Sequence, residues 1–456
     1  MVARLTEFRV EKLFGLYNHT IPVNTKQRIT IIIGPNGRGK TVCLKFIEAF
    51  FAKKPSYFAD IDFEYALFTF SDDESIKVES IAGAAAATGD GVPVRLIRYT
   101  LRRPGYEDVE WIPSVANSAL WREIHRHISP GWHQLNAYTW KDETDDEEIT
   151  TDEMIQRYRI PPKLADRIKQ DIPEPIGKLI DEIDCHLIEA QRLLVFPANP
   201  HVDREFPPYY QYEAINQRSK GSRLAVQQKA ANLASILGDT LKRYANKSQS
   251  LERTFPLRVF EAQGSAKFSE AELRAELRKL DERRDALMTS GLLDTDYRPV
   301  SLRDGDMQPG VAMALEIYVK DTTEKLNVFN DMGARIDLFK KIINDRLIDK
   351  ELKIDRENGF EIVLSNGTSV PLDKLSSGEQ HELILIFDLI FEIGSNSLIL
   401  LDEPELSLHV SWQRSFIDSL SKIIALNPFD ILLATHSPSI LAKHFDLSVE
   451  LAPVDK

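Results

Sequence analysis

Apolar residues follow a two-residue period near the N-terminus and a helical period further along, and together they predict a mixed α/β protein. The segments "LTEFRVEKL", "LYNHTIPV" and "QRITIII" predict three short strands, and "TVCLKFIEAFF" predicts the apolar helix after them. "FEYALFTF", "ESIKVESI" and "VRLIRYTL" predict further strands within residues 60–113. Residues 115–182 predict mainly helical and irregular structure, and "HLIEAQRLLVF" at 186–196 predicts a buried strand.

Residues 213–290 change to a helical period. Leu273, Leu277, Leu280 and Leu287 recur at helical spacing, and a further helical stretch follows at 311–348. This pattern predicts a helical or short coiled-coil insertion, and because the heptads are few we expect no long rod. "ELKIDRENGFEIVLSNGTSVPL" predicts a β-meander with Asn-Gly turns. We therefore predict an N-terminal lobe at 1–204, an insertion at 205–348 and a C-terminal lobe at 349–456.

Composition narrows the classes of protein. A chain of 456 residues with 43% hydrophobic residues is long enough for a large core, and its net charge of −13 argues against a general DNA coat. The net charge does not exclude a local basic groove that binds nucleic acid. Two cysteines, the absence of a signal-peptide pattern and the shortness of the apolar runs indicate a cytoplasmic protein without a membrane span.

A glycine-rich stretch joins a predicted strand to a predicted helix. In "ITIIIGPNGRGKTVCLKF", Gly34 is followed by four residues and then by Gly39, Lys40 and Thr41, which is the P-loop spacing. Backbone N–H groups of such a loop surround a phosphate, the lysine reaches the β- and γ-phosphates, and the Thr hydroxyl holds Mg²⁺. The predicted nucleotide-binding residues here are Asn36, Gly37, Arg38, Gly39, Lys40 and Thr41. The alternative is an ordinary strand-to-helix turn, and whether Arg38 faces phosphate or solvent stays open.

Two acids follow a later buried strand. In "SLILLDEPELSLH" four apolar residues precede Asp402 and Glu403, so both acids lie at the carboxyl edge of the sheet, where ligands bind in α/β proteins. We expect Asp402 to bind Mg²⁺ and Glu403 to act as the general base toward water. The alternative is a solvated acidic turn.

The next buried strand, "FDILLATHSPSIL", ends at His436. This histidine follows the carboxylates by one helix and one strand, so we expect it at the same edge of the sheet. That position suits a hydrogen bond to the γ-phosphate or the attacking water. A structural histidine at a strand end is the alternative.

One segment has no chemistry of its own. "KLSSGEQHELILIFDLI" (374–390) places Ser376, Ser377 and Gly378 at the start of an apolar helix. The P-loop, "LSSGEQ", "LLDEPELSLH" and "ATHSP" come in the order of an ABC-type ATPase, and "LSSGEQ" resembles its signature motif. The resemblance implies that Ser376, Ser377, Gly378 and Gln380 complete the ATP site of a second subunit. The alternative is a plain helix N-cap.

The signature variant is similar to that of SMC, RecF and OLD-like ATPases, whose heads are also split by a helical insertion. The resemblance implies an ABC-type P-loop ATPase head, a mixed sheet flanked by helices, with an α-helical insertion. It also implies that Gln191 in "IEAQRLL" is the Q-loop glutamine near Mg²⁺, and that residues 406–409 contact the opposite subunit.

Among these families the chain most resembles AriA, the ATPase subunits of the PARIS anti-phage system, with PtuA-type Septu and retron ATPases as near alternatives. The segment after His436 is too short for a TOPRIM nuclease, so we expect that effector on a separate protein. The resemblance implies a homo-oligomer, an ATP-bridged dimer or a hexamer, and a phage-encoded trigger.

Other functions stay open. A RecF-like repair ATPase would grip duplex DNA directly. The helical insertion disfavours a transporter subunit, and the sequence shows no second metal constellation for a stand-alone nuclease.

Overall fold

The computed structural model describes residues 3–82, 95–113, 127–128, 131–134, 139–142, 148–161, 172–189, 213–261, 268–293 and 308–451. The chain divides into two compact units. Unit 1 comprises Met1–Ala190 with Gly394–Lys456, and unit 2 comprises Gln191–Ile393. Residues 349–393 therefore cluster with the helical segment, whereas the three-segment division remains a prediction from the sequence.

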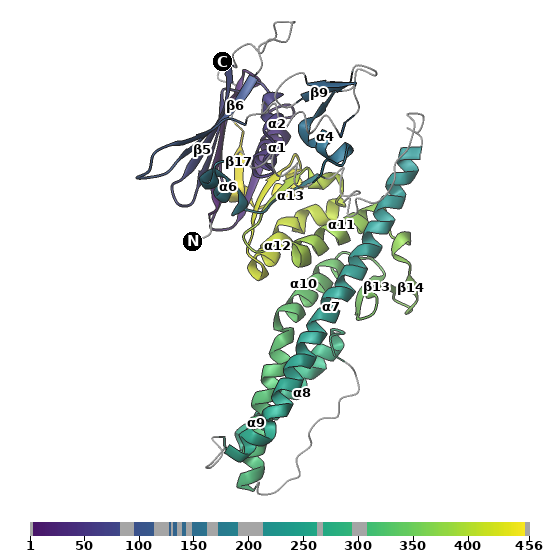
Figure 1. The fold of residues 1–456 in the computed structure, drawn as a ribbon. Helices are drawn as coiled ribbons and strands as arrows, with labels where there is room; N and C mark the ends of the chain where they lie inside the picture. The colour runs from purple at the N-terminus through teal and green to yellow at the C-terminus, as the bar shows by residue number, and fades with distance from the viewer. Residues whose placement is uncertain are drawn as a thin grey trace. The chain divides into compact units, whose positions relative to one another are not determined.

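Unit 1 contains an antiparallel sheet of six strands (Figure 1). Its order is β2 (Tyr17–Pro22), β1 (Leu5–Leu13), β4 (Tyr65–Phe70), β5 (Ser75–Ala82), β6 (Arg95–Arg102) and β7 (Val109–Trp111). The alternation of buried and more exposed residues along β4 shows why the two-residue period predicted these strands.

A five-stranded parallel sheet is the second layer of unit 1. Its order is β11 (Cys185–Glu189), β15 (Leu398–Asp402), β16 (Asp430–Ala434), β3 (Ile29–Ile33) and β17 (Ser448–Glu450). β15 and β16 are almost entirely buried, as expected for central parallel strands. The register sets Asp402 opposite Glu189 on one side and Ala434 on the other, so three strands end together.

Helix α1 (Lys40–Phe51) fixes the position of the loop before it. It packs against β11, β15 and β16 and shares a core with the antiparallel sheet. The Phe50 ring lies 3.9 Å from that of Phe68, and the Phe46 ring lies 5.0 Å from that of Phe58. Apolar contacts on both sides thus hold the first turn of α1 rigidly. Further helices of unit 1 are α2 (Pro55–Ala59), α6 (Glu174–Asp181), α12 (Val410–Leu426) and α13 (Pro438–Leu441).

A small sheet occupies part of the region that the sequence predicted as mainly helical and irregular. It consists of β8 (Trp132–Gln134), β9 (Thr139–Asp142) and β10 (Glu148–Thr150), followed by α4 (Thr151–Arg157). Trp132 and Trp140 are buried in its core. The prediction is wrong for these residues because strands of three or four residues are too short to show a period, and packing of the two indoles decides the structure.

Unit 2 is built around one very long helix. α7 (Glu213–Glu261) has 49 residues and packs against α9 (Pro309–Leu326), which also packs against α8 (Glu270–Thr289) (Figure 1). η1 (Asn327–Phe329) and α10 (Asn330–Asn344) follow α9. Our expectation of no long rod is therefore wrong. Val226, Ala230, Leu233 and Leu237 form a short buried stripe on α7, and the helix is further supported because it contacts β13, α11 and α9.

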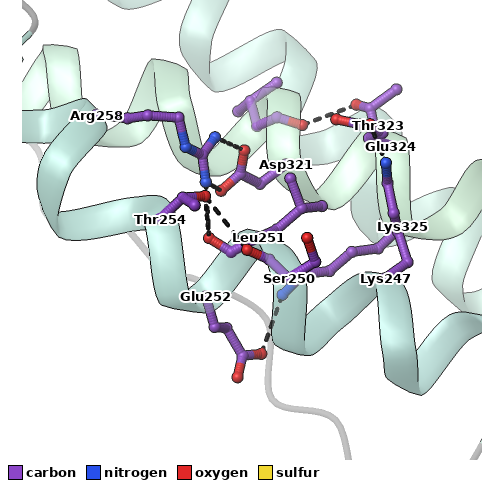
Figure 2. Close-up of polar contacts among 11 residues, drawn as sticks. Lys247, Ser250, Leu251, Glu252, Thr254, Arg258, Asp321, Thr323, Glu324 and Lys325 are labelled. Carbon is purple, nitrogen blue, oxygen red and sulfur yellow. Dashed lines mark hydrogen bonds and ion pairs between the residues drawn. The ribbon is translucent and has the colours of Figure 1, made fainter.

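Polar contacts fasten the far part of α7 to α9 (Figure 2). Arg258 pairs with the buried Asp321 and also donates to the carbonyl of Leu251 at 2.7 Å. Lys325 and Glu252 are 3.1 Å apart. Because Pro256 interrupts the hydrogen bonding inside α7, the Arg258 contacts stabilise the helix where its own backbone is weakest.

The predicted β-meander is confirmed as β12 (Lys350–Asp355), β13 (Gly359–Leu364) and β14 (Ser369–Val370). Both turn glycines have positive φ, 81° at Gly359 and 83° at Gly367. A Cβ at Gly359 would also overlap the Ala230 carbonyl of α7, so only glycine allows this approach.

Charged side chains hold α11 (Ser377–Phe387) and the π-helical turn η3 (Asp388–Glu392) within unit 2. Lys350 lies 2.8 Å from Glu379. Arg346 pairs with Glu382, and both are buried. Lys229 on α7 lies 2.7 Å from Asp388 and 2.6 Å from Glu392. Ion pairs thus join α11 to residues 346 and 350, and they join the turn after it, η3, to the long helix α7.

None of the helices among the described residues combines the length and the apolar character that a bilayer crossing requires.

Candidate functional site

The loop between β3 and α1 requires its glycines. φ is 152° at Gly34, 76° at Gly37 and 84° at Gly39. A Cβ on Gly39 would also come within 2.9 Å of the Leu13 side chain. Other residues would strain this backbone, so the glycine spacing that predicts a phosphate loop is also what the conformation demands.

Lys40 begins α1 and is only 5% exposed. Its ammonium donates to the carbonyl of Gly34 at 2.8 Å and contacts the His436 ring. Burial lowers the pKa of Lys40, although Glu403, Asp402 and Glu405 act in the opposite direction. A buried ammonium whose contacts are backbone carbonyls and a histidine ring can exchange those contacts for an anionic ligand.

Thr41 and Asp402 meet at the sheet edge. The Thr41 hydroxyl donates to Asp402 Oδ1 at 3.1 Å. Burial raises the pKa of Asp402, and the carboxylates of Glu403 and Glu189 act in the same direction. A divalent cation would relieve this clustering of negative charge, and hydroxyl and carboxylate oxygens are ligands that Mg²⁺ accepts.

No group of three or more His, Cys, Asp or Glu side chains in the described residues is placed to hold a metal. The donor set nevertheless fits Mg²⁺, which commonly uses one or two protein ligands together with substrate phosphates. Thr41 and Asp402 would hold it.

Glu403 lies in a backbone conformation that is unusual for its residue type. Its φ is 48°, and its backbone N–H donates to the Ala434 carbonyl at 2.9 Å. Its carboxylate lies 3.8 Å from Nε2 of His436. The neighbouring strand thus holds a strained residue in place, as is frequent at functional sites.

A polar network that sequence reasoning missed holds the backbone of His436 through Glu405. Glu405 Oε1 accepts the backbone N–H of His436 at 2.7 Å. Gln413 donates to the Glu405 carbonyl at 3.3 Å and accepts from the Ser437 hydroxyl at 2.6 Å. "DEPE" places a third acid beside the two predicted ones, but the sequence did not reveal which backbone group it holds.

Glu189 is a further residue that was not predicted. It ends β11 opposite Asp402 and lies 2.9 Å from Lys45 on α1. β11 is only partly buried, unlike the buried strand predicted at 186–196, whose residues after 189 lie outside the described part of the chain. The place of Glu189 as the last polar residue of this strand is the signal that would have indicated it.

These groups surround a cavity of about 830 Å³ in unit 1. The predicted residues Asn36 to Thr41, Glu403 and His436 all line it. The other lining residues are Phe14, Val42, Glu405, Leu406, Gln413 and Ser437. Chain segments nearly 400 residues apart therefore form one site, which can accept a polyphosphate with a bound cation.

The segment "SSGEQ" is described within unit 2 alone. Ser376 is the N-cap of α11: its side chain accepts from the Glu379 N–H at 3.3 Å, and Glu379 accepts from the Ser376 N–H at 2.8 Å. Burial alone would raise the pKa of Glu379, but hydrogen bonds from Lys350 and Ser376 outweigh it and lower that pKa. The N-cap alternative is therefore realised, and Ser376 and Ser377 remain exposed.

Gln380 differs from its neighbours because its side chain is buried, with 3% exposure. Its amide donates to the carbonyls of Leu375 at 3.0 Å and Leu372 at 3.3 Å, so it supports the loop before α11. Gln191 lies outside the described residues. In the 406–409 segment Leu406 is 61% exposed, and His409 accepts from the Ser411 N–H as the N-cap of α12.

The fold and the site define a P-loop nucleotide-binding protein of the α/β class, as the sequence predicted. Residues 141–442, about two thirds of the chain, match the family described as "AAA domain, putative AbiEii toxin, Type IV TA system". The chain belongs to this family.

Curated relatives match over shorter segments. "Retron Vc95 probable ATPase" of Vibrio cholerae is 27% identical over 143 residues, which are 27% of each chain. "Retron Ec83 probable ATPase" of Escherichia coli is 31% identical over 100 residues, 20% of this chain and 18% of the relative. "Protein ea59" of Escherichia phage lambda is 30% identical over 106 residues, 23% of this chain and 20% of the relative. The chain thus spans about a quarter or less of the length of these relatives.

A solved Smc head domain from Thermotoga maritima is 10% identical and aligns over 98% of this chain and 94% of that one, with a TM-score of 0.31. That score is too low to carry an argument, so the fold is described from this chain's own strands and helices.

Proposed function

We propose that this chain binds ATP with Mg²⁺ and hydrolyses it to ADP and phosphate. The observation that carries the proposal is the meeting of four elements at one cavity: the P-loop, Thr41 in contact with Asp402, Glu403, and His436. Two relatives whose names read "probable ATPase" support it.

Each residue has a separate role in the proposed reaction. Lys40 binds the β- and γ-phosphates, for which it exchanges its present carbonyl contacts. Thr41 and Asp402 hold Mg²⁺, which neutralises phosphate charge when bound. Glu403 takes a proton from the attacking water, and His436, oriented by Glu405, donates to the γ-phosphate.

We further propose that two copies share their sites. Ser376, Ser377 and Gly378 of one copy would approach the γ-phosphate held by the other, where the N-terminus of α11 favours negative charge. Phe14 and Leu406 line the cavity and are 44% and 61% exposed. Apolar side chains at such a position would be covered in a closed pair. Because Gln380 is buried, we assign it a role in holding the signature loop rather than direct contact with ATP.

The biological role we propose is control of a separate effector in anti-phage defence. The retron ATPase relatives and the family description, which names a toxin, support a defence or toxin system. A homo-oligomer that holds a TOPRIM nuclease, as in AriA, and a phage-encoded trigger protein remain finer proposals. Because two of the relatives are retron ATPases by name, we propose a retron-type ATPase subunit as equally supported with the AriA type. A RecF-like grip on duplex DNA is the remaining alternative, and no comparison favours it.

The test is an affinity purification of tagged Glu403→Gln protein from native cells with ATP, followed by mass spectrometry and native mass. We expect an oligomer with a stoichiometric effector protein. Lys40→Ala protein, which we expect to lose ATP binding, is the matched control and should lose the oligomer. A dimer that retains DNA and no protein partner would replace the proposal with the RecF-like alternative.

A further inference from the structure

Strand β2 contacts the phosphate loop at one residue through two side chains. His19 is 1% exposed, and its Nε2 lies 2.8 Å from the carbonyl oxygen of Arg38. A carbonyl oxygen only accepts hydrogen bonds, so Nε2 carries the hydrogen and donates it. Burial lowers the pKa of His19, which keeps the ring neutral at neutral pH.

Tyr17 holds the other end of Arg38. Its ring stacks on that of His19, with centroids 5.7 Å apart and an interplanar angle of 13°. The guanidinium of Arg38 lies 5.6 Å from the Tyr17 ring centroid, within cation–π range. Arg38 is therefore held at its carbonyl by His19 and at its side chain by Tyr17, and we call these two residues the β2 clasp.

The contact at the carbonyl determines where the next N–H points. In a trans peptide the C=O of one residue and the N–H of the next point in opposite directions. Because the Arg38 carbonyl is directed at His19, which does not line the cavity, the Gly39 N–H is directed away from His19. Gly39 itself lines the cavity, so this N–H is available to a phosphate there.

We propose that the β2 clasp is a positioning device for phosphate binding: His19 orients the 38–39 peptide so that the Gly39 N–H faces the phosphates, and Tyr17 directs the Arg38 cation along the cavity wall. This inference rests on the proposed nucleotide function. It also resolves the question that the sequence left open for Arg38, because a side chain held over Tyr17 lines the phosphate cavity.

The experiment compares matched variants of the full chain by calorimetric titration with MgATP. His19→Leu removes the donor and should raise Kd about five- to tenfold, the range for one hydrogen bond. His19→Gln offers an amide N–H and should stay within about threefold of wild type. KM should rise with kcat nearly unchanged, since the contact serves bound substrate and transition state alike.

Three results would overturn the inference. One is an unchanged Kd in His19→Leu despite a lower Tm, which would make the histidine purely structural. Another is an equal loss in His19→Gln and His19→Leu. The third comes from titration with inorganic tripolyphosphate, which has no base or sugar: if the loss appears only with ATP, His19 acts on the nucleoside.

Two variants of Tyr17 test the same inference in case His19→Leu does not fold. Tyr17→Leu should weaken MgATP binding about threefold, in line with one cation–π contact, whereas Tyr17→Phe keeps the ring and should lose less. Equal binding by both would overturn the clasp. If the wild-type protein binds MgATP no better than Lys40→Ala does, the proposed function fails. If the wild-type protein binds MgATP and the His19 and Tyr17 variants bind it equally well, this inference alone fails.

Discussion

Each unit contains a buried lysine, and the two lysines have opposite properties. Lys40 in unit 1 contacts backbone carbonyls and a histidine ring, and burial lowers its pKa. Lys229 in unit 2 is also desolvated, but Asp388 and Glu392 lie within hydrogen-bond distance and its pKa is raised. Burial is common to both, so the direct carboxylate partners make the difference.

The comparison separates a binding site from a structural ion cluster. Around Lys40 the acids lie at longer range and border an open cavity, so the charge can be matched by a ligand. Around Lys229 the cation already has two carboxylate partners on η3, and burial raises the pKa of one of them, Asp388, to about 7. We expect substitutions in the first group to change chemistry and those in the second to change stability.

The largest expected effect is on turnover. Glu403→Gln keeps the shape and hydrogen-bonding reach of the side chain but removes the base, so kcat should fall by about 10²–10⁴ while ATP still binds. Phosphate release and calorimetric titration measure the two quantities, with Glu403→Asp as a carboxylate-retaining comparison. Normal turnover in Glu403→Gln would exclude it as the base.

The matching substitution in unit 2 should act on folding. Lys229→Met keeps most of the apolar volume but leaves two carboxylates without their cation, which should cost about 3–5 kcal/mol in the free energy of unfolding. The double variant Lys229→Met with Asp388→Leu should recover much of that loss. Denaturant titration measures both, and a Lys229→Met loss below 1 kcal/mol, taking that figure as roughly the value of an exposed pair, would contradict the buried-cluster description.

The lowered pKa of Lys40 predicts a pH effect. The ammonium binds phosphate only while protonated, so ATP affinity should fall as pH rises through that lowered pKa, before an ordinary lysine with a pKa of about 10.4 would titrate. Lys40→Arg should move this loss of affinity to higher pH. Titrations in buffers of different ionisation enthalpy should also show that protons are taken up when ATP binds. If no protons are taken up, the pKa of Lys40 is not lowered.

The smallest effect concerns the start of α11. Ser376→Ala removes the N-cap of α11 and should lower the free energy of unfolding by about 1 kcal/mol. Ser376→Asp retains a cap and should restore stability. Ser376→Arg adds bulk and charge, and we expect it to block pairing of copies and hence ATPase activity; full activity would refute the shared site.

The sequence predicted what local spacing determines. The glycines of the phosphate loop and the acid after β15 depend on short, regular patterns, and the structure brings Gly37, Gly39 and Glu403 to one cavity. It did not predict the length of α7, because that depends on packing against β13, α11 and α9. Glu189 and Glu405 were not predicted as site residues for a related reason. Their importance depends on which strand or backbone group lies beside them in the fold.

The length of α7 means that a small tilt at one point gives a large displacement further along the helix. Lys229 and Leu251 are 22 residues apart, or about 33 Å at the rise of an α-helix. A tilt of about 5° at Lys229 would displace the backbone at Leu251 by about 3 Å over that length. Since Lys229 is paired with the π-helical turn that follows α11, a change in the direction of α7 at Lys229 would act directly on the contacts beside α11.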